Sequence, residues 1–529
     1  MASDDRSSDA GDREENGAGK RRRGSARRQR RLAPDVGVDG IRLSRFLPTA
    51  EFFAADDIVA SGCSDDPDGC GPGDVFVARL TAAGDGHDEV ARALARGVVG
   101  VVAERMIPTF GTPLCIVPDT GWAMARLAHA LAGDPARSLR VIAVTGTSGK
   151  TTTAWLTASV LSEAGLRVGV LSDIGCIDAD ASEPEPADLR SPRVLAGWLG
   201  RLAAGGCTHA VVEVSSEMLA EHALAGISCD TVVVTNLASA HLDVHGTSAA
   251  YRSVKSRILD CLGPQGCLVA NADDERIRRL IERRTATGAS GPVVTAGLTA
   301  SADVTAVPVE RSLAGQTFLI HSGGHAMPVA VSTPVASFAR NSLLATAVGL
   351  RYRVPLERIA RGLEAAGGVP GRVERIDRGQ DHAAFVDHPT SGHALAGTLA
   401  GLRRLTPGRL VVLAEEGAVE RMAAGAGRDE SVLGDFSRRI ARWADQCLVV
   451  PATLLDEDGA AADLAAYARV DRLLGTMRPE DCLLVLGEAA WDGRLGGPDG
   501  TPPSLAAVVD GWLQLAHVPQ PFGAGRRAA

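Results

Sequence analysis

The sequence contains very little lysine. Of its 55 basic residues, only Lys20, Lys150 and Lys255 are lysines, and arginine supplies the rest. Arginine replaces lysine in most ion pairs, but its guanidinium group offers no compact amine to a phosphate and does not readily form a carbamate. Lys20 lies in a polar N-terminal segment, whereas the other two lysines lie in patterned segments. Lys150 and Lys255 are therefore candidates for positions where the chemistry requires an amine, and chance retention is the alternative for either one alone.

Long apolar runs, metal-binding cysteine patterns and a strong net charge are also missing. No uninterrupted apolar run reaches the ~18 residues of a membrane-spanning helix, and no apolar segment follows the charged N-terminus as in a signal peptide. We therefore expect a cytoplasmic protein without a membrane partner. The ten cysteines contain no Cys-x-x-Cys pair, so we expect reduced, small apolar side chains rather than a zinc site. The net charge of −9 gives no overall sign of a nucleic-acid partner.

The chain of 529 residues is too long for a single hydrophobic core, so we expect about three domains. The predicted division is a disordered charged tail at 1–36, a small α/β domain at 37–138, a central domain at 139–365 and a second α/β domain at 366–529. The tail has eight basic residues between Lys20 and Arg31. A solvated charge run is the simpler interpretation of that segment, and contact with a nucleic acid or an anionic lipid is the alternative.

Strand and helix patterns alternate through most of the chain. In the N-terminal domain, strands are predicted at 73–78, 98–103 and 112–117. In the central domain, strands are predicted at 141–144, 168–171, 210–214, 231–235 and 267–270. In the last domain, they are predicted at 384–386, 410–413, 447–450 and 482–486. The alternation favours an α/β fold with a mainly parallel, helix-covered central sheet.

One stretch, Val141–Thr153, has the pattern of a phosphate-binding turn. Four apolar residues predict a buried strand, Gly146-Thr-Ser-Gly149 a turn, and Lys150 the start of a helix that runs to Gly165. A helix N-terminus behind a glycine-rich loop offers backbone N–H groups to phosphates, with Lys150 reaching the β- and γ-phosphates and the Thr151 hydroxyl on Mg²⁺. Only two residues separate the glycines, where the generic phosphate loop has four, so a tight turn that binds nothing is the alternative.

Polar residues follow the predicted strands at one edge of the sheet. Glu213 ends one strand, and because open parallel sheets bind ligands at this edge, it is a candidate Mg²⁺ ligand, with a surface carboxylate as the alternative. His241 and a second histidine lie in a later loop at the same edge, and a metal site and structural histidines are both open for them. Tyr251 and Lys255 follow four residues apart and therefore share one helix face.

Several uncommon motifs occur in order along the chain. They are Pro72-Gly-Asp-Val-Phe-Val-Ala78, Gly84-Asp-Gly-His87, Gly146-Thr-Ser-Gly-Lys-Thr-Thr152, Thr208-His-Ala-Val-Val-Glu-Val-Ser-Ser216, Thr235-Asn-Leu237, His241-Leu-Asp-Val-His-Gly-Thr247, Tyr251-x-x-x-Lys255, Asn271-Ala-Asp-Asp274 and Pro370-Gly-Arg-Val-Glu374. With these motifs, residues 38–400 resemble the Mur ligases, the ATP-dependent amide-forming enzymes of peptidoglycan precursor synthesis. The most similar branch is the UDP-N-acetylmuramoyl-tripeptide synthetases, which add the third residue of the peptide.

The resemblance implies a small N-terminal nucleotide-sugar domain, a central ATPase domain and a C-terminal Rossmann-like ligase domain. It implies that ATP phosphorylates a substrate carboxylate, and that an amine attacks the acyl phosphate to give an amide, ADP and phosphate. Positioning and charge neutralisation would dominate such catalysis. The substrates would be a nucleotide-sugar peptide and an amino acid, with ATP and Mg²⁺ as cofactors, and we expect a cytoplasmic monomer.

By the same resemblance, individual residues take family roles. The catalytic residues would be Lys150, Lys255, His241 and Glu213. The nucleotide would contact Gly146, Thr147, Ser148, Gly149, Lys150, Thr151, Thr152 and Asn271, together with Arg372 and Asp387 from the last domain. Thr151 and Glu213 would hold one Mg²⁺, and His241 and a carbamylated Lys255 would hold a second. The acceptor substrate would contact Ser64, Ser191 and Ser216.

The C-terminal domain departs from the family pattern. Its corresponding runs read Asp387-His-Pro-Thr-Ser-Gly-His393, Glu415-Glu-Gly-Ala-Val-Glu-Arg421, Val450-Pro-Ala-Thr453 and Gly487-Glu-Ala-Ala-Trp491. Further departures elsewhere are Cys63-Ser-Asp65, Glu217, Ala223 and Ala240. ATP handling is therefore expected to be intact, whereas recognition of the amino acid is expected to be rewritten or lost, and acceptor recognition is open.

Three interpretations follow. The chain is an active ligase on a UDP-muramoyl-peptide-like acceptor, a nucleotide-binding paralogue that is catalytically weak or silent, or an amide ligase on another acid, like the folylpolyglutamate and cyanophycin synthetases. The two retained lysines argue against the silent paralogue, because an inactive site would let them drift to arginine. The sequence does not assign the amino acid that is added.

Overall fold

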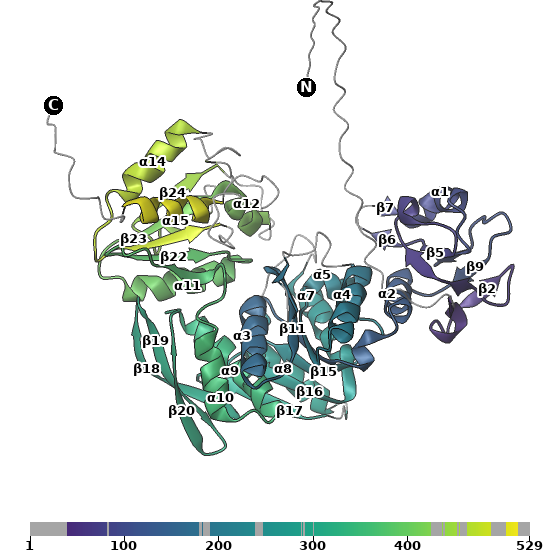
Figure 1. Ribbon diagram of the computed structural model, residues 1–529, viewed down its shortest axis with the longest axis horizontal. Coiled ribbons are helices and arrows are strands. Elements are labelled where there is room, and N and C mark those ends of the chain that lie inside the picture. The colour runs from purple at the N-terminus through teal and green to yellow at the C-terminus, as the bar shows by residue number, and fades with distance from the viewer. Residues whose placement is uncertain are drawn as a thin grey trace, which may run out of the picture.

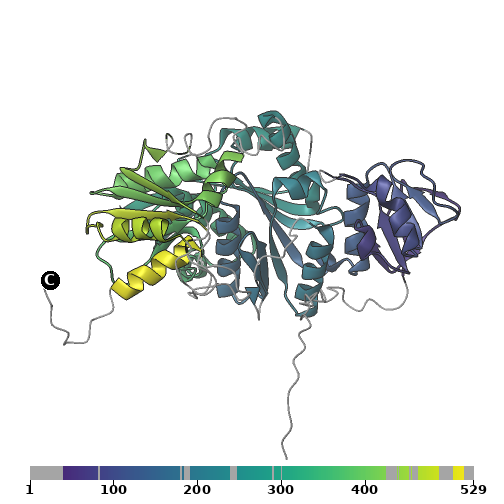
Figure 2. The same cartoon turned by 90° about the horizontal axis from the view of Figure 1, so that it is seen from above.

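The computed structural model describes residues 40–516, apart from segments at 82–83, 179–181, 184–190, 239–246, 287, 289–290, 300, 425–435, 437, 439, 452–453, 455–462 and 488–503. The predicted tail at 1–36 and His241 lie outside the described residues. Within the described part, no helix is both long and apolar enough to cross a membrane. The chain forms three lobes, with the N-terminal and C-terminal lobes at opposite ends of the central lobe (Figure 1, Figure 2).

The N-terminal lobe is built on a five-stranded sheet in the order β2-β9-β8-β5-β4. These strands are β2 (Glu51–Phe53), β4 (Gly62–Ser64), β5 (Asp74–Val77), β8 (Gly100–Ala103) and β9 (Leu114–Ile116). Two small ladders join β1 (Ile41–Arg42) to β3 (Val59–Ala60) and β6 (Leu80–Thr81) to β7 (Gly84–Asp85). The helices are α1 (Val90–Ala95) and α2 (Thr120–Leu131), and α2 packs against α4 (Pro192–Ala204) of the central lobe.

Charged groups connect the N-terminal lobe to the central lobe. The Arg79 guanidinium donates to Asp65 of its own lobe at 2.7 Å and to Glu221 of the central lobe at 3.2 Å. Arg193 of α4 donates to the Ser64 hydroxyl at 3.1 Å. Because Arg79 is buried, its charge is stabilised mainly by these two carboxylates. These polar contacts join the two lobes alongside the apolar packing of α2 against α4.

The central lobe is built on an eleven-stranded sheet in the order β13-β12-β11-β14-β10-β15-β16-β17-β18-β19-β20. Its strands are β10 (Arg140–Thr145), β11 (Val168–Ser172), β12 (Gly175–Ile177), β13 (Ser182–Glu183), β14 (His209–Glu213), β15 (Cys229–Val234), β16 (Leu262–Asn271), β17 (Val293–Gly297), β18 (Val304–Ser312), β19 (Gly315–Ser322) and β20 (His325–Val331). Its helices are α3 (Lys150–Glu163), α4 (Pro192–Ala204), α5 (Ser216–Ala220), α7 (Ser248–Ser256), α8 (Glu275–Ala286), α9 (Ala336–Arg351) and α10 (Leu356–Ala365).

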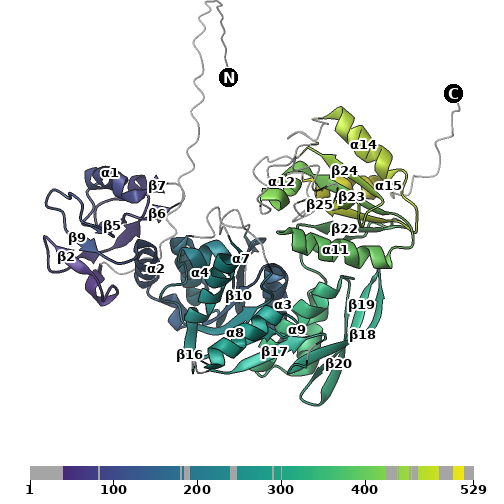
Figure 3. The same cartoon turned by 180° about the vertical axis from the view of Figure 1, so that it is seen from behind.

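Alternate residues of the central strands pack into different cores. Ile142 and Val144 of β10 belong to a cluster with residues of α3, α9 and α10. Val141 and Ala143 belong to a second cluster with residues of α4, α5 and α8. Successive side chains of a strand point to opposite faces, so helices cover both faces of the sheet around β10, and β10 and β14 are buried along almost their whole length. Figure 3 shows α3, α9 and α8 around the strands from behind.

The prediction of a mainly parallel sheet is confirmed for the run from β11 to β18, in which neighbouring strands are parallel. Antiparallel strands extend the sheet at both ends: β12 and β13 at one end, and β19 and β20 at the other. These strands are absent from the sequence analysis. In β18 to β20 most residues are half-buried or exposed, so their apolar content is lower than that of the buried strands.

The C-terminal lobe has a five-stranded sheet in the order β21-β22-β25-β23-β24, with β21 as an antiparallel edge. The strands are β21 (Arg372–Ile376), β22 (Ala383–Asp387), β23 (Leu410–Glu415), β24 (Gln446–Val450) and β25 (Cys482–Leu486). The helices are α11 (Gly392–Leu405), α12 (Glu416–Ala424), α14 (Leu464–Leu474) and α15 (Leu505–Ala516). The three-lobed α/β architecture agrees with the predicted fold class, while the exact domain boundaries stay predictions.

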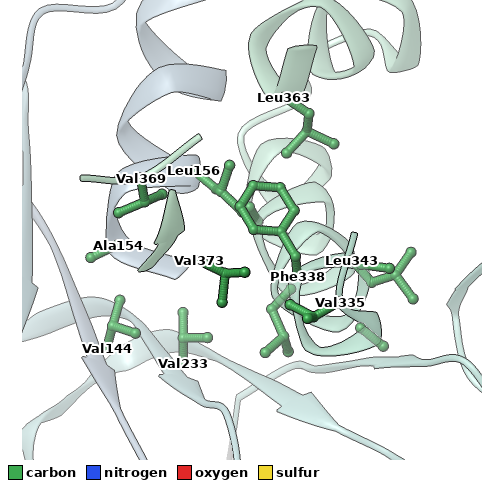
Figure 4. Close-up of a cluster of buried hydrophobic side chains, with 14 of the residues drawn as sticks. Val144, Ala154, Leu156, Val233, Val335, Phe338, Leu343, Leu363, Val369 and Val373 are labelled. Atoms are coloured by element: carbon green, nitrogen blue, oxygen red, sulfur yellow. The ribbon is translucent and has the colours of Figure 1, made fainter. Parts of the chain in front are cut away.

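Apolar contacts connect the C-terminal lobe to the central lobe. Val369 and Val373 of the connecting segment belong to the same core cluster as Val144, Leu156 and Phe338 of the central lobe. Figure 4 shows these side chains converging between the central strands and helices. The cluster also contains residues of the C-terminal sheet, so one continuous core links the two lobes.

Helix α3 is packed closely against α10. A Cβ atom on Gly362 would lie 2.7 Å from the Cα of Val160 and 3.2 Å from the carbonyl oxygen of Ser159. The Ser159 hydroxyl also donates to the Gly362 carbonyl at 2.7 Å. These contacts involve backbone atoms of α3, which cannot move aside as a flexible side chain can. The absence of a side chain at Gly362 therefore sets the distance between the two helices.

Gly362→Ala is expected to lower the free energy of unfolding by about 1–3 kcal/mol, because the methyl group overpacks this helix contact. Gly397→Ala in α11 is the matched control: no atom lies within 4 Å of the added Cβ. The control is expected to be neutral or to gain up to about 1 kcal/mol, since alanine is the better helix former. The urea midpoint of unfolding, followed by circular dichroism, measures both. A Gly362→Ala protein with the midpoint of the control would contradict the close-packing argument.

Candidate active site

The glycine-rich loop connects β10 to the start of α3, as predicted. Gly149 precedes the helix in a left-handed conformation, and Lys150 is the first helical residue. Asn236, just after β15, holds the loop: its side-chain oxygen accepts from the Ser148 N–H at 3.0 Å, and its amide donates to the Ser148 carbonyl at 2.8 Å. The Thr147 N–H donates to the Asn236 carbonyl at 3.1 Å. The Thr147 and Ser148 amides are thus held by Asn236, and the first turn of α3 offers further N–H groups to an anion.

Two positions in the loop require glycine. A Cβ on Gly149, whose φ is +78°, would lie 2.6 Å from the side-chain oxygen of Asn341. A Cβ on Gly146 would lie 1.9 Å from the Thr235 hydroxyl, which itself donates to the Ser148 carbonyl at 2.6 Å. Close approach of neighbouring side chains therefore explains both glycines of the motif.

Lys150 and Glu213 form a buried ion pair at the carboxyl edge of the sheet. The Lys150 Nζ lies 3.5 Å from the Glu213 Oε1, and the Glu213 side chain is 1% exposed. Among the residues that the structure describes, no group donates a hydrogen bond to that buried oxygen. Burial, followed by the neighbouring Asp173 carboxylate, raises the pKa of Glu213 to about 7. Burial alone would lower the pKa of Lys150, but the Glu213 and Asp173 carboxylates outweigh it and raise the pKa.

Asp173 is a site residue that the sequence analysis did not identify. It lies in the turn between β11 and β12, and its N–H donates to the Glu213 Oε2 at 3.2 Å. Its carboxylate lies 3.9 Å from a guanidinium nitrogen of Arg372. The signal was present in the sequence, because Asp173 lies two residues after the strand predicted at 168–171, at the same edge as Glu213.

Lys255 lies on the other side of the loop, on α7. Its Nζ donates to the Thr145 hydroxyl at 3.1 Å and to the Gly146 carbonyl at 3.2 Å, and the residue is 2% exposed. Tyr251, one turn earlier, donates its hydroxyl to that of Thr147 at 3.2 Å. Burial, followed by the charge of Lys150, lowers the pKa of Lys255 to about 7. A substantial fraction of this amine is therefore neutral at neutral pH.

The C-terminal lobe contributes Arg372 to the same place. The Arg372 guanidinium donates to the Thr151 hydroxyl at 3.1 Å and also to the carbonyl of His388. The next residue, Val373, has a φ of +52°, which is unusual for a β-branched residue, and it lies at a bulge in the β21–β22 pairing. Val373 packs into the core beside Phe338 (Figure 4). The bulge thus directs Arg372 out of its own sheet and toward Thr151.

Asp387 ends β22 and is buried beneath Arg372. Its carboxylate accepts from the Thr398 hydroxyl at 2.9 Å and from the Val373 N–H at 3.3 Å. Burial raises the pKa of Asp387 to about 6, although these donors and Arg372 act in the opposite direction. Asp387 therefore supports the strand that carries Arg372.

A cavity of about 940 Å³ lies between the central and C-terminal lobes. Lys150 and Thr151 line it from the central lobe, and Arg372 and Asp387 line it from the C-terminal lobe. Asn271, at the end of β16, lines it further along and donates its side-chain amide to the Thr235 carbonyl at 2.8 Å. The volume of this cavity lies in the range of pockets that bind a cofactor-sized molecule.

The serines predicted to contact an acceptor lie away from this cavity lining. Ser64, at the end of β4, is buried, and its hydroxyl donates to the Asp66 carbonyl and accepts from the Asp66 N–H, each at 3.1 Å. Ser191 precedes α4 and is half-buried, and Ser216 begins α5 and is buried. Their role stays a prediction, as does that of His241, which lies outside the described residues.

The oxygens of Thr151 and Glu213 suit Mg²⁺. A hydroxyl and a buried carboxylate oxygen without a donor are hard ligands of the type that this cation prefers. Among the described residues, no group of three or more histidine, cysteine, aspartate and glutamate side chains is arranged to hold a metal ion. A cation here would therefore rely on a second source of oxygen ligands, such as phosphates.

Comparison with known proteins gives the family of the chain. The model described as the Mur ligase middle domain matches residues 144–349. A UDP-N-acetylmuramoyl-L-alanyl-D-glutamate–2,6-diaminopimelate ligase of Chlorobaculum tepidum is 31% identical over 457 residues, covering 81% of this chain and 88% of the relative. A UDP-N-acetylmuramyl-tripeptide synthetase of Roseiflexus sp. is 32% identical over 442 residues, covering 78% of this chain and 82% of the relative.

Solved structures agree in fold. A UDP-N-acetylmuramoyl-L-alanyl-D-glutamate–2,6-diaminopimelate ligase has a TM-score of 0.65 at 21% identity, covering 90% of this chain and 99% of its own. The MurF ligase of Thermotoga maritima, in complex with ADP, has a TM-score of 0.53 at 18% identity, covering 80% and 93%. The resemblance read from the motifs is thereby confirmed. The chain belongs to the Mur ligase family, whose members are ATP-dependent ligases.

Proposed function

We propose that this chain joins a carboxylate of a UDP-N-acetylmuramoyl-peptide-like acceptor to an amine in peptidoglycan precursor synthesis, with ATP as the energy source. The observation that carries the proposal is the buried Lys150–Glu213 pair at the start of α3, in contact with Arg372 through Thr151 and Asp173. The names of the relatives described above specify UDP-muramoyl peptides, and one protein of similar fold was solved in complex with ADP.

The residues around the cavity would act by neutralising and aligning phosphates. The acceptor carboxylate attacks the γ-phosphorus of ATP, forming an acyl phosphate and releasing ADP. The amine then attacks the acyl carbon, phosphate leaves, and the amine loses a proton to give the amide. Lys150, the N–H groups of α3 and Arg372 would balance the charge that moves between these groups. The phosphate site would be formed by the residues of the loop and the first turn of α3: Gly146, Thr147, Ser148, Gly149 and Thr152. Asn271 and Asp387 would form part of the remaining cavity wall.

Thr151 and Glu213 would hold Mg²⁺ at this site. When bound, the cation would neutralise negative charge on the transferring phosphate. Glu213 is suited to this role because its Oε1 accepts no hydrogen bond within the described part of the chain. The Lys150 ammonium group would stay close enough to neutralise part of the negative charge on the Glu213 carboxylate.

Lys255 would act as a carbamate. A carbamate forms when a neutral amine attacks CO₂ and loses a proton, and the lowered pKa of Lys255, about 7, keeps the neutral form available. Arginine cannot undergo this reaction, which accounts for a lysine at this position. By family resemblance, the carbamate would hold a second Mg²⁺ together with His241.

A second candidate is an amide ligase on a different acid. This candidate is favoured by contacts within the N-terminal lobe. There the Asp65 side chain pairs with Arg79, and the Ser64 hydroxyl already forms hydrogen bonds with Asp66 and Arg193. The family serines Ser64, Ser191 and Ser216 would otherwise face the nucleotide-sugar peptide. The amino acid is left open, because the motifs of the C-terminal lobe differ from the family pattern.

The test is phosphate release from ATP with a panel of acceptors and amines. A UDP-muramoyl dipeptide, a UDP-muramoyl tripeptide, a folate and a polyaspartate-type acid are each combined with a set of amino acids. Release with a UDP-muramoyl peptide, and a product of the mass of the amide, is the expected result. Release with another acid alone would favour the second candidate, and tight ADP binding with no release for any pair would indicate a silent paralogue.

Lys150→Ala is expected to reduce kcat by about 10²–10³-fold, because it removes a charged donor from the transferring phosphate. Lys150→Arg should also fail to restore full turnover, since a guanidinium group does not fit the space of a compact amine. Arg167→Ala, which removes an exposed cation just beyond α3, is the matched control and should turn over like the wild type. Initial rates of phosphate release measure all three. Normal turnover of Lys150→Ala would contradict the assignment.

Lys255→Arg and Lys255→Ala are both expected to lose most activity. Added formate or acetate should partly rescue Lys255→Ala, because a small carboxylate can fill the place of the carbamate, and should leave the wild type unchanged. In the wild type, ¹³C-labelled bicarbonate should give a carbamate signal by NMR that Lys255→Arg lacks. That signal should fade as the pH falls below about 7, where the amine becomes protonated. A Lys255→Arg enzyme with normal turnover would exclude the carbamate.

A further inference from the structure

Asp173 is held in a fixed position by a tight turn. Ser172 pairs with Gly175 across the β11–β12 hairpin, so Asp173 is one of only two residues in the turn. The Ser172 hydroxyl accepts from the Trp155 indole at 3.0 Å and donates to the Gly175 carbonyl at 3.2 Å. The Asp173 N–H donates to Glu213 at 3.2 Å. The backbone of this short turn therefore fixes the position of the Asp173 carboxylate at the edge of the sheet.

Asp173 places a second carboxylate beside Glu213, which is already paired with the Lys150 ammonium group. The Asp173 N–H donates to the Glu213 Oε2 at 3.2 Å, so the two carboxyl groups lie close together, and the Asp173 charge adds to burial in raising the pKa of Glu213. Two neighbouring acidic groups in a poorly solvated site are costly unless cations compensate them. Here the compensation comes from Lys150, 3.5 Å from Glu213, and from Arg372, 3.9 Å from Asp173.

Arg372 lies where it would compete with a divalent cation. The same guanidinium nitrogen that faces Asp173 donates to the Thr151 hydroxyl at 3.1 Å. Thr151 is also the hydroxyl assigned above to Mg²⁺, and two positive groups on one oxygen repel each other. A cation that binds Thr151 would therefore displace Arg372 from this oxygen and leave the Asp173 carboxylate without its partner.

We propose that Asp173 is a positioning residue that exchanges Arg372 for the divalent cation when the nucleotide binds. Before binding, Asp173 holds the Arg372 guanidinium of the C-terminal lobe beside Thr151. When Mg²⁺ and the nucleotide enter, the carboxylate compensates the cation, directly or through water, and Arg372 moves to the phosphates. The proposal rests on the proposed function, and it makes the placement of the C-terminal lobe depend on the cation.

The test compares ADP affinity with and without Mg²⁺ by isothermal titration calorimetry. In wild-type protein, excess Mg²⁺ should tighten ADP binding relative to excess EDTA. In Asp173→Asn, EDTA binding should be equal or tighter, because one negative charge no longer faces the phosphates. The gain from Mg²⁺ should fall by about tenfold, because the cation loses a compensating carboxylate. Asp173→Glu, which keeps the charge, should recover part of the gain.

Glu163→Gln is the matched control. It also changes a carboxylate to an amide in an ion pair, with Arg361 at 3.3 Å, but at the far end of α3. Its gain from Mg²⁺ should equal that of the wild type. An Asp173→Asn protein that loses affinity equally in both buffers would show a merely structural role and overturn the proposal, as would an unchanged gain. Failure of the wild type to bind ADP in either buffer would instead refute the proposed function on which it rests.

Discussion

The buried contact between Lys150 and Glu213 is the interaction on which the rest of the site depends. Each charge would be costly without the other, because both side chains are largely removed from water. Glu213 can occupy this position only because β14 lies between β10 and β11, which carry the glycine loop and Asp173 at the same edge. The order of three strands thus places the cation, the carboxylates and the helix N-terminus together.

A second amine, that of Lys255 on α7, contacts the same glycine-rich loop. Lys255 donates to Thr145 and Gly146, at the end of β10, while Lys150 lies beyond the loop at the start of α3. The two amines share one poorly solvated region, so the charge on Lys150 favours the neutral form of Lys255. Lys150 is thereby kept charged, and Lys255 is made easy to deprotonate. Arginine is also charged, but it is not a compact amine and does not lose its proton, so it would replace neither lysine. This difference is a physical reason for two lysines in an arginine-rich chain.

The sequence predicted the strand–loop–helix unit, Glu213 and the face shared by Tyr251 and Lys255, because each follows from a short local pattern. It also predicted that Arg372 reaches the nucleotide site, but only through family resemblance. Three features lay beyond it. The antiparallel strands β18 to β20 have weak apolar patterns, although Gly323-Gly324 marks their last turn. The bulge at Val373 depends on packing across lobes, and the contact of Asp173 with Arg372 joins residues far apart in the chain.

The two end lobes differ in the balance of charged and apolar contacts that attach them to the central lobe. Arg79 and Arg193 connect the N-terminal lobe through ion pairs and a hydrogen bond, whereas Val369 and Val373 connect the C-terminal lobe through apolar contacts. Salt screens attraction between charges, while it leaves the burial of apolar surface intact or strengthens it. Rising ionic strength is therefore expected to weaken the ion pair of Arg79 with Glu221 at one joint and that of Arg372 with Asp173 at the other, while the shared apolar core keeps the C-terminal lobe attached.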